Sequence, residues 1–190
     1  MVRCRREQEE RLWCQSINLQ KMGKTLELSE KKECILFRST LCIPKTKVLV
    51  LVIYIPHNDP KIRKDIQQQV IKRIFECQSK RKATKVIILG NFNDIRCREL
   101  DQNRKDSKRN QKLPLLSWLG NSNMVDVFRK LHPYEMKFTR VNDQVKSRID
   151  YIWVSKDLGQ SLTYCDILEA DVITNSDHAI VIAKMLTGIP

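Results

Sequence analysis

The sequence lacks the features of secreted, membrane-spanning and zinc-binding proteins. Its seven cysteines form an odd set without a Cys-x-x-Cys pair, which argues against both a disulfide framework and a zinc site. The longest apolar run, Val48 to Ile55, is far too short to cross a bilayer, and no apolar segment follows the charged amino terminus. These absences indicate an intracellular protein of the cytoplasm or nucleus that is neither secreted nor anchored in a membrane.

Acidic residues are also scarce relative to basic ones. The chain has 22 Asp and Glu against 35 Lys and Arg, which gives a formal net charge of +13. Such an excess favours an anionic partner such as nucleic acid, although basic residues spread along most of a chain are also typical of a solubilising surface. The length of 190 residues and the hydrophobic content of 42% fit one domain with a sizeable core.

The apolar pattern places the start of the folded domain near residue 34. Residues 1–33 are polar and charged, show no strong apolar stripe and are assigned no function, whereas residues 34–190 alternate apolar segments with loops. Cys34 to Phe37 is predicted to be a strand. Val48 to Ile55 is predicted to be a second strand, and its continuous apolar run indicates burial on both faces.

A helix is predicted directly after the second strand. Asp59 has the position of an N-cap, and Pro60 has that of the first helical residue. Apolar residues then recur every four positions, at Ile62, Ile66, Val70 and Ile74. This stripe predicts an amphipathic helix that packs on a sheet.

The remaining segments mix predicted helices and strands without an internal repeat. Residues 96–112 are basic and aperiodic and predict a long surface loop. Further predicted elements are a helix at Leu113 to Leu119 with Gly120 as its C-cap, a packed segment at Met124 to His132 ended by Pro133, and strands at Phe138-Thr139, Arg148 to Ser155 and Ile180 to Met185. The mixed order indicates an α+β domain of stacked sheets flanked by helices.

The stretch from Val86 to Asp94, VIILGNFND, predicts a buried strand that enters a tight turn at Gly90. If the alternation continues, Asn91 and Asn93 share one face while Phe92 points into the core. Side chains at the end of a buried strand often belong to a functional site. Taken alone, however, Gly-Asn after a strand is more often an ordinary turn.

Two further predicted strands carry polar groups at one end. Asp150 lies within Ser147 to Tyr151, and Ser176-Asp177-His178 comes just before the last strand. An imidazole oriented by a carboxylate can protonate or polarise a phosphate oxygen, and a second carboxylate can help to hold a divalent cation. A lone Ser-Asp-His is most simply a cap, but its combination with the other two groups favours a site.

These residues resemble the endonuclease/exonuclease/phosphatase superfamily, whose fold is shared by deoxyribonuclease I, apurinic/apyrimidinic endonucleases and the endonuclease domains of non-LTR retrotransposons. Four short motifs carry the resemblance in the family's order: Tyr54-x-Pro56-x-Asn58, Gly90 to Asn93, Ser147 to Tyr151, and Ser176 to His178. It extends from about Val48 to Lys184 and implies a four-layer α/β/β/α sandwich. The retrotransposon branch looks most similar, because Val125 to Arg129 is followed by His132-Pro133 and a Phe-Thr before Ser-Arg-Ile-Asp.

The resemblance also implies roles for individual residues. Asp150 would orient His178, which would lie against the scissile phosphate. Asn93 would hydrogen-bond the phosphate or the attacking water, and Tyr54 would support the phosphate. Asp177 would lie beside a divalent cation, Mg²⁺ or Mn²⁺.

The sequence departs from the family pattern in two places. Asn91 stands where the family has an aspartate that activates or positions water, and an amide cannot accept that proton. The family's metal-binding glutamate has no clear counterpart, because none of Glu27, Glu30 and Glu33 follows an apolar strand. The chain therefore resembles the carboxyl-terminal two-thirds of the family's domain. Loss of general-base help alone is expected to lower the rate roughly 10²- to 10⁴-fold, so we expect a mobile-element-derived endonuclease-like domain with impaired catalysis.

The implied partner is nucleic acid, DNA more than RNA, with no membrane or protein partner indicated. The residues expected to contact it are Arg104, Lys105, Lys108, Arg109 and Arg148. Two alternatives stay open: a phosphatase acting on small or lipid phosphoesters, and a non-catalytic nucleic-acid-binding remnant. If the early strands are absent, the apolar segment from Val48 to Ile55 would lie near an unprotected sheet edge and cause poor solution behaviour.

Overall fold

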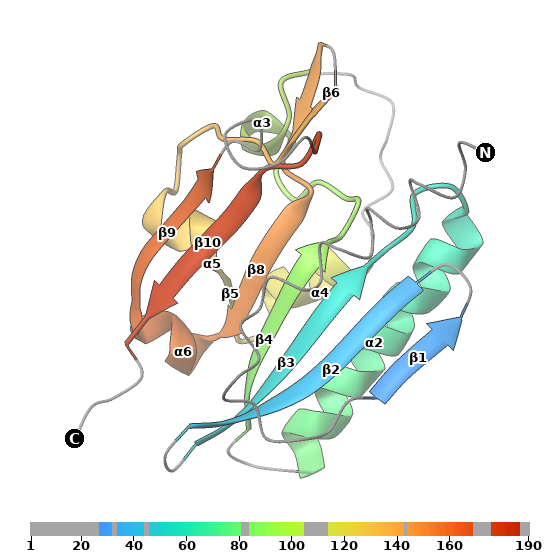
Figure 1. Cartoon of the computed structure of the whole chain (residues 1–190), viewed down its shortest axis with the longest axis vertical. Coiled ribbons are helices and arrows are strands. Elements are labelled where there is room, and N and C mark those ends of the chain that lie inside the picture. The colour runs from blue at the N-terminus through green and yellow to red at the C-terminus, as the bar shows by residue number, and fades with distance from the viewer. Residues whose placement is uncertain are drawn as a thin grey trace.

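The computed structural model describes residues 27–31, 34–43, 46–80, 84–104, 114–142, 144–168 and 176–186 (Figure 1). Within these residues a six-stranded sheet has the order β1-β2-β3-β4-β8-β5. Its strands are β1 (Glu27–Lys31), β2 (Cys34–Ile43), β3 (Thr46–Tyr54), β4 (Thr84–Asn91), β5 (Met124–Asp126) and β8 (Asp150–Ser155).

Strand β3 lies inside this sheet. It pairs antiparallel with β2 on one side and parallel with β4 on the other, and all of its residues from Val48 to Ile53 are buried. The predicted burial on both faces is confirmed. The expectation that this segment lies near an unprotected edge is wrong, because β2 pairs with it from Leu36 to Ile43.

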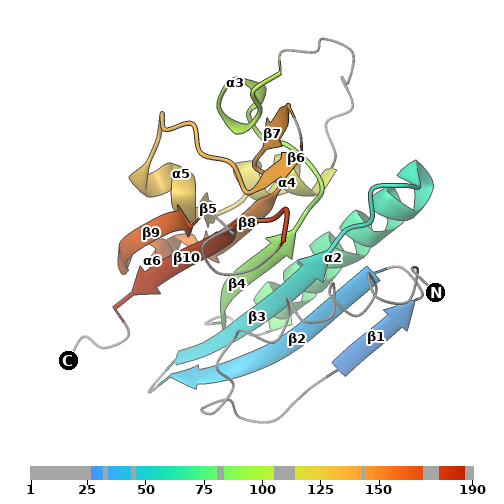
Figure 2. The same ribbon diagram turned by 45° about the horizontal axis from the view of Figure 1, so that its top comes forward.

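Helices α2 (Pro60–Lys80) and α4 (Pro114–Asn121) cover one face of the sheet (Figures 1 and 2). Asp59 caps α2 as predicted, because its Oδ1 accepts hydrogen bonds from Lys61 N at 2.7 Å and Ile62 N at 3.1 Å. The predicted stripe of α2 packs in a core with odd-numbered residues of β3 and with leucines of α4. No helix in the described ranges is long and apolar enough to cross a membrane.

A second sheet covers the other face. Strands β9 (Leu162–Leu168) and β10 (Ile180–Met185) pair antiparallel, and the short helices α5 (Val127–Leu131) and α6 (Lys156–Gln160) lie beside them (Figure 1). Even-numbered residues of β3 form the core of this side with side chains of β8, β9 and α5. The layering confirms the predicted α+β class of sheets stacked between helices. Strand β9 and helix α6 were not predicted.

Several local predictions need correction. The segment 96–112 is not simply a loop, because residues Arg98–Asp101 form the helix α3 and Asp101 is fully buried. Residues 105–113 lie outside the described part. Gly120 lies within α4, which ends only at Asn121, so it is not the C-cap.

The residues Phe138 and Thr139 do not form a strand. They lead instead into a hairpin of two short strands, β6 (Arg140–Asn142) and β7 (Val145–Ser147). Thr139 is held by hydrogen bonds to residues distant in the chain, described below, and not by strand pairing.

Candidate functional site

Three neighbouring strands of the large sheet each place a polar residue in one row, at the end of β3, the end of β4 and the start of β8. Tyr54, the last residue of β3, pairs with Asn91, the last residue of β4, and Asn91 pairs with Asp150, the first residue of β8. Side chains of paired residues point to the same face of a sheet. Because Phe92 and Tyr151 next to them pack toward the helices, the three polar side chains lie on the face of β9 and β10.

Gly90 allows β4 to run straight into this row. The predicted tight turn at Gly90 is wrong, since β4 continues through it to Asn91. Gly90 has φ +131°, and a Cβ at this position would lie 2.0 Å from the backbone oxygen of Ile53. Only glycine tolerates this conformation and this approach, so the residue is required for the close packing of β4 against β3 beside the site.

The two asparagines are held by backbone groups. Asn91 Oδ1 accepts a hydrogen bond from Asn93 N at 2.7 Å. The predicted alternation stops at Asn93, which has φ 46° and donates from Nδ2 to the oxygen of Ile55 at 2.7 Å. The oxygen of the Asn91 side chain is therefore already engaged, and its amide nitrogen can donate but not accept a proton.

The structure brings His178 and Asp150 together. His178 Nδ1 lies 2.8 Å from Asp150 Oδ2, and the side chains are 17% and 4% exposed. The second oxygen, Asp150 Oδ1, is buried without a hydrogen-bond partner in the described part of the chain. A ring that donates through Nδ1 to a buried carboxylate is fixed in orientation, and its Nε2 lies 4.0 Å from Oδ1 of the half-exposed Asp177.

The environment of His178 favours the protonated ring. Burial by itself lowers the pKa of His178, but the hydrogen bond to Asp150 and the charges of Asp150 and Asp177 outweigh it, so the pKa is raised above its usual value. Arg140 opposes this shift. A protonated imidazole at this position can donate a hydrogen bond or a proton to a phosphate oxygen.

Thr139 connects the two members of the pair. It is fully buried, and its hydroxyl oxygen accepts hydrogen bonds from Ile149 N and Asp150 N, both at 3.0 Å. Its backbone oxygen accepts from Ala179 N, next to His178, at 2.7 Å. Sequence reasoning missed this role, because the Phe-Thr pair was interpreted as part of a strand.

The described residues do not fit the divalent-metal site that the resemblance implies. The side chain of Asp177 is 52% exposed, and its Oδ2 accepts a hydrogen bond from Arg140 Nε at 3.1 Å. No group of three or more His, Cys, Asp or Glu in the described ranges could hold a metal ion. Glu27 and Glu30 lie on β1, and Glu33 lies outside the described residues.

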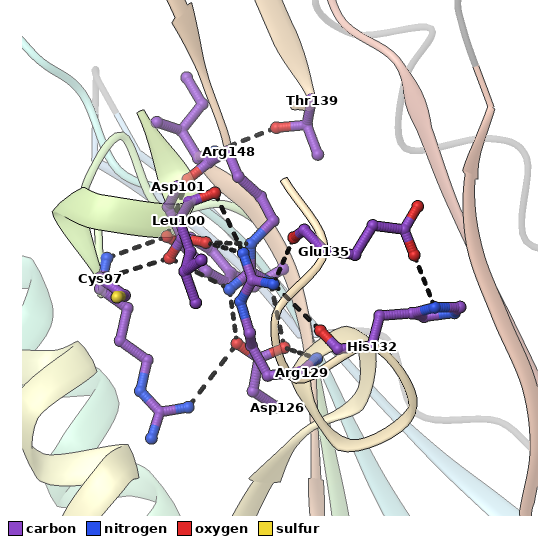
Figure 3. Close-up of polar contacts among 12 residues, drawn as sticks. Cys97, Leu100, Asp101, Asp126, Arg129, His132, Glu135, Thr139 and Arg148 are labelled. Atoms are coloured by element: carbon purple, nitrogen blue, oxygen red, sulfur yellow. Dashed lines mark hydrogen bonds and ion pairs between the residues drawn. The ribbon is translucent and has the colours of Figure 1, made fainter. Parts of the chain in front are cut away.

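Arg148 lies in a buried ionic cluster with Asp101, Asp126 and Arg129, named here the Arg148 cluster (Figure 3). Its Nε lies 2.9 Å from Asp101 Oδ1, its Nη2 lies 2.8 Å from Asp126 Oδ2, and its side chain is only 1% exposed. The guanidinium also packs over the Tyr151 ring at 4.4 Å. The prediction that Arg148 contacts nucleic acid is therefore wrong, because the side chain is buried and fully engaged.

The other predicted nucleic-acid contacts are only partly described. Arg104 is exposed at the carboxyl end of the segment that carries α3, whereas Lys105, Lys108 and Arg109 lie outside the described residues. These four positions stay a prediction from the sequence.

Asp94 is a further acidic group next to the site. Burial raises its pKa to about 6, although the hydrogen bond from Ile95 N and the charges of Arg63 and Arg98 oppose the rise. Its backbone oxygen accepts a hydrogen bond from the Tyr151 hydroxyl at 3.1 Å. Sequence reasoning did not single out this residue, because its burial depends on groups distant in the chain.

Comparison with known proteins gives one family and several related structures. Residues 24–178 match the sequence profile of the Endonuclease/Exonuclease/phosphatase family. A search against curated protein sequences returned no match. The family match includes residues 24–33, which the sequence analysis placed outside the domain.

Among solved structures, the fold is similar to the Xenopus laevis APE2 catalytic domain, with 22% identity and a TM-score of 0.64. The match covers 82% of this chain but only 55% of that chain. It is also similar to the Neisseria 3′ phosphatase NExo bound to a product DNA hairpin, with 18% identity, a TM-score of 0.64, and coverage of 85% and 69%. An AP endonuclease from Archaeoglobus fulgidus gives 18% identity, a TM-score of 0.62, and the same coverage. At these identities the likeness shows a shared fold.

Proposed function

Because the chain belongs to the endonuclease/exonuclease/phosphatase family, we propose that it binds nucleic acid through the phosphate backbone and hydrolyses the bound phosphodiester only slowly. The observation that carries this proposal is the Asp150–His178 hydrogen bond of 2.8 Å, formed at the row of strand ends. The net charge of +13 supports an anionic polymer as the ligand.

In the proposed site, His178 hydrogen-bonds or protonates an oxygen of the phosphodiester while Asp150 holds its ring. In this proposal Asn93 and Tyr54 contribute polar contacts to the phosphate. Asn91 can hydrogen-bond a water but cannot take its proton, and the absence of a general base lowers rates by roughly 10²- to 10⁴-fold. Dependence on Mg²⁺ or Mn²⁺ stays a prediction from the resemblance, and no step of this proposal passes through a metal.

DNA is the favoured substrate class. The similar structures include a 3′ phosphatase bound to a DNA hairpin and an AP endonuclease, and no base-reading motif occurs in this sequence. Binding should therefore be salt-sensitive and largely independent of sequence. Fluorescence anisotropy with two duplexes of unrelated sequence, at about 50 and about 200 mM salt, tests this. An affinity unchanged by salt would contradict it.

The predicted basic contacts can be tested with a matched control. Replacing Arg104, Lys105, Lys108 and Arg109 together by glutamine should weaken binding to all sequences and reduce its salt dependence. The control replaces four other exposed basic residues and should change affinity much less. They are Lys72 and Arg73 on α2, Lys156 on α6, and Lys184 near the end of β10. An equal loss of affinity in both variants would show that the total positive charge of the protein, and not these four positions, determines nucleic-acid binding.

Within the family, we infer that the chain belongs with the endonuclease domains of non-LTR retrotransposons. Support comes from the Val125 to Arg129 stretch, followed by His132-Pro133 and Phe138-Thr139. The genomic sequence upstream tests this origin: retrotransposon sequence in frame would support it, and an unrelated gene would not.

Phosphomonoester hydrolysis is the second candidate function. It is favoured by the similarity in fold to the Neisseria 3′ phosphatase. Phosphate release from a 3′-phosphorylated oligonucleotide and from a small or lipid phosphoester separates it from the first proposal. Release without nicking of intact DNA would make phosphatase activity the better assignment, whereas DNA binding without either activity would indicate a non-catalytic remnant.

A further inference from the structure

Exposed hydrophobic side chains gather in one short segment next to the site. Leu131 is 37% exposed, Tyr134 is 85% exposed and Met136 is 52% exposed. Single exposed hydrophobic residues are common on protein surfaces. Three within six positions, one of them an almost fully exposed tyrosine, indicate a contact surface. The segment 132–139, which joins α5 to β6, is named here the Tyr134 loop.

The backbone around Tyr134 is held in place on both sides. Arg129 Nη1 donates hydrogen bonds to the backbone oxygens of His132 at 3.0 Å and Glu135 at 2.6 Å. The side chains of His132 and Glu135 also meet, with 2.7 Å between Nδ1 and Oε2. The loop is thus fixed while the Tyr134 ring faces solvent, so less conformational freedom is lost when the ring binds a ligand.

The loop leads directly to the site. Its last residue, Thr139, accepts the hydrogen bond from Asp150 N described above. Five residues of chain span at most about 18 Å, so Tyr134 lies within that distance of Thr139. Figure 2 shows the loop rising at the same end of the molecule as α3 and the β6–β7 hairpin. A chain-like ligand whose phosphate lies against His178 can therefore extend to this loop.

Basic side chains lie on both sides of the Tyr134 ring along the segment. Lys130 is exposed, and the side chains of Lys137 and Arg140 are 32% and 35% exposed while they pair with Asp166 and Asp177. Arg129 is held in the Arg148 cluster and is not available to a ligand. Basic residues that follow a backbone, together with an aromatic ring on which a base stacks, are the usual means of binding single-stranded nucleic acid. We propose that Tyr134 is a stacking platform for an unpaired base of a nucleic acid whose backbone is bound at the Asp150–His178 site. This inference rests on the proposed function.

The test measures anisotropy with a labelled single-stranded oligonucleotide, a duplex of the same sequence, and a strand of the same length built of abasic nucleotides. The proteins are the unmodified chain, Tyr134→Ala, Tyr134→Phe and Phe75→Ala. Phe75 is a matched control, because it is 65% exposed but lies on α2, which covers the opposite face of the sheet.

Tyr134→Ala should weaken binding of the single strand about 5- to 150-fold, the range that corresponds to stacking of one base. Tyr134→Phe and Phe75→Ala should retain it. The abasic strand, which has no base to stack, should bind the unmodified chain and Tyr134→Ala with equal affinity, and the duplex should show a smaller loss than the single strand.

Two results would overturn the inference alone. One is single-strand binding that is unchanged in Tyr134→Ala, which would leave the exposed ring to another partner such as a protein. The other is an equal loss on the abasic strand, which would show that Tyr134 acts without stacking. Failure of the unmodified chain to bind any of the three strands would overturn the proposed function together with this inference.

Discussion

Arg148 and Asp150 lie two residues apart in the chain but belong to two different groups of charged side chains. In the Arg148 cluster the four side chains are at most 11% exposed, and every charge has a close opposite charge. In the Asp150–His178 pair the imidazole is 17% exposed, and Asp150 Oδ1, like Arg129 Nε of the cluster, is buried without a hydrogen-bond partner within the described residues. Charges that are buried and paired with one another serve packing, whereas a partly exposed imidazole at a row of strand ends is suited to binding a ligand.

In the Arg148 cluster, burial and charged partners have opposite effects on the pKa of Asp101. Burial alone would raise the pKa of Asp101, but hydrogen bonds and charge from Arg148 and a hydrogen bond from Arg129 outweigh it, so the pKa is lowered. Asp101 is therefore ionised in the folded protein because its partners are buried with it. Its ionisation contributes stability above the carboxyl's ordinary pKa, and this contribution is lost as the pH falls through the lowered value.

The largest predicted effect on stability comes from removing the central arginine of the Arg148 cluster. Arg148→Met leaves Asp101 and Asp126 with less charge compensation in the interior, and breaking a buried ion pair in this way typically costs about 3–5 kcal/mol of unfolding free energy. Urea denaturation measures the change. Arg140→Met is the control, because its ion pair with Asp177 is exposed and should contribute about 1 kcal/mol or less. Similar losses in both variants would contradict the distinction between the two regions.

Asp94 is a half-buried carboxyl, and the charges of Arg63 and Arg98 do not fully offset the effect of its burial on its pKa. Its pKa of about 6 in the folded state lies above the unfolded value, so ionisation destabilises the fold as the pH rises from about 4 to about 6. Asp94→Asn should have little effect near pH 4 and stabilise the protein by up to about 3 kcal/mol at pH 7. Thermal unfolding at both pH values measures this, and a stabilisation that is equal at both would refute the assignment.

Thr139→Val removes the acceptor shared by two buried backbone N–H groups beside Asp150. Unsatisfied buried donors cost about 1–3 kcal/mol each, and the looser carboxylate should lower the pKa of His178 toward its usual value. Thr139→Ser keeps the hydroxyl and should retain the His178 titration. An NMR titration of the imidazole, which a purely structural role would leave unmoved, measures the effect. Identical titrations in the valine variant and the unmodified chain would exclude Thr139 as a positioning residue.

The parts of the fold that follow from local patterns were predicted. The Asp59 cap, the apolar stripe of α2 and the continuous burial of β3 each depend on residues close in sequence, and the structure agrees with them. The strand ends that carry Asn91 and Asp150 were also placed at the site from sequence, and the register of β4 with β8 makes them direct neighbours.

The wrong predictions depend on partners far away in the chain. Asp101 was assigned to a solvated loop because its neighbours are polar, but Arg148, which is 47 residues away, draws it into the interior. Arg148 was assigned to a ligand surface because it is basic, although two aspartates bury it. Gly90 indicated a turn, whereas its role is the close approach to Ile53 on a neighbouring strand. No local periodicity contains this information.

Impaired catalysis through Asn91 is tested most directly by plasmid nicking, with and without a chelator, by the unmodified chain, Asn91→Asp and Asn91→Asp/His178→Ala. We predict that Asn91→Asp nicks at least about tenfold faster than the unmodified chain, with a gain smaller than the roughly 10²- to 10⁴-fold that a general base can supply. Adding His178→Ala should abolish this gain. Nicking by the unmodified chain as fast as by Asn91→Asp, or activity that survives the loss of His178, would contradict this prediction.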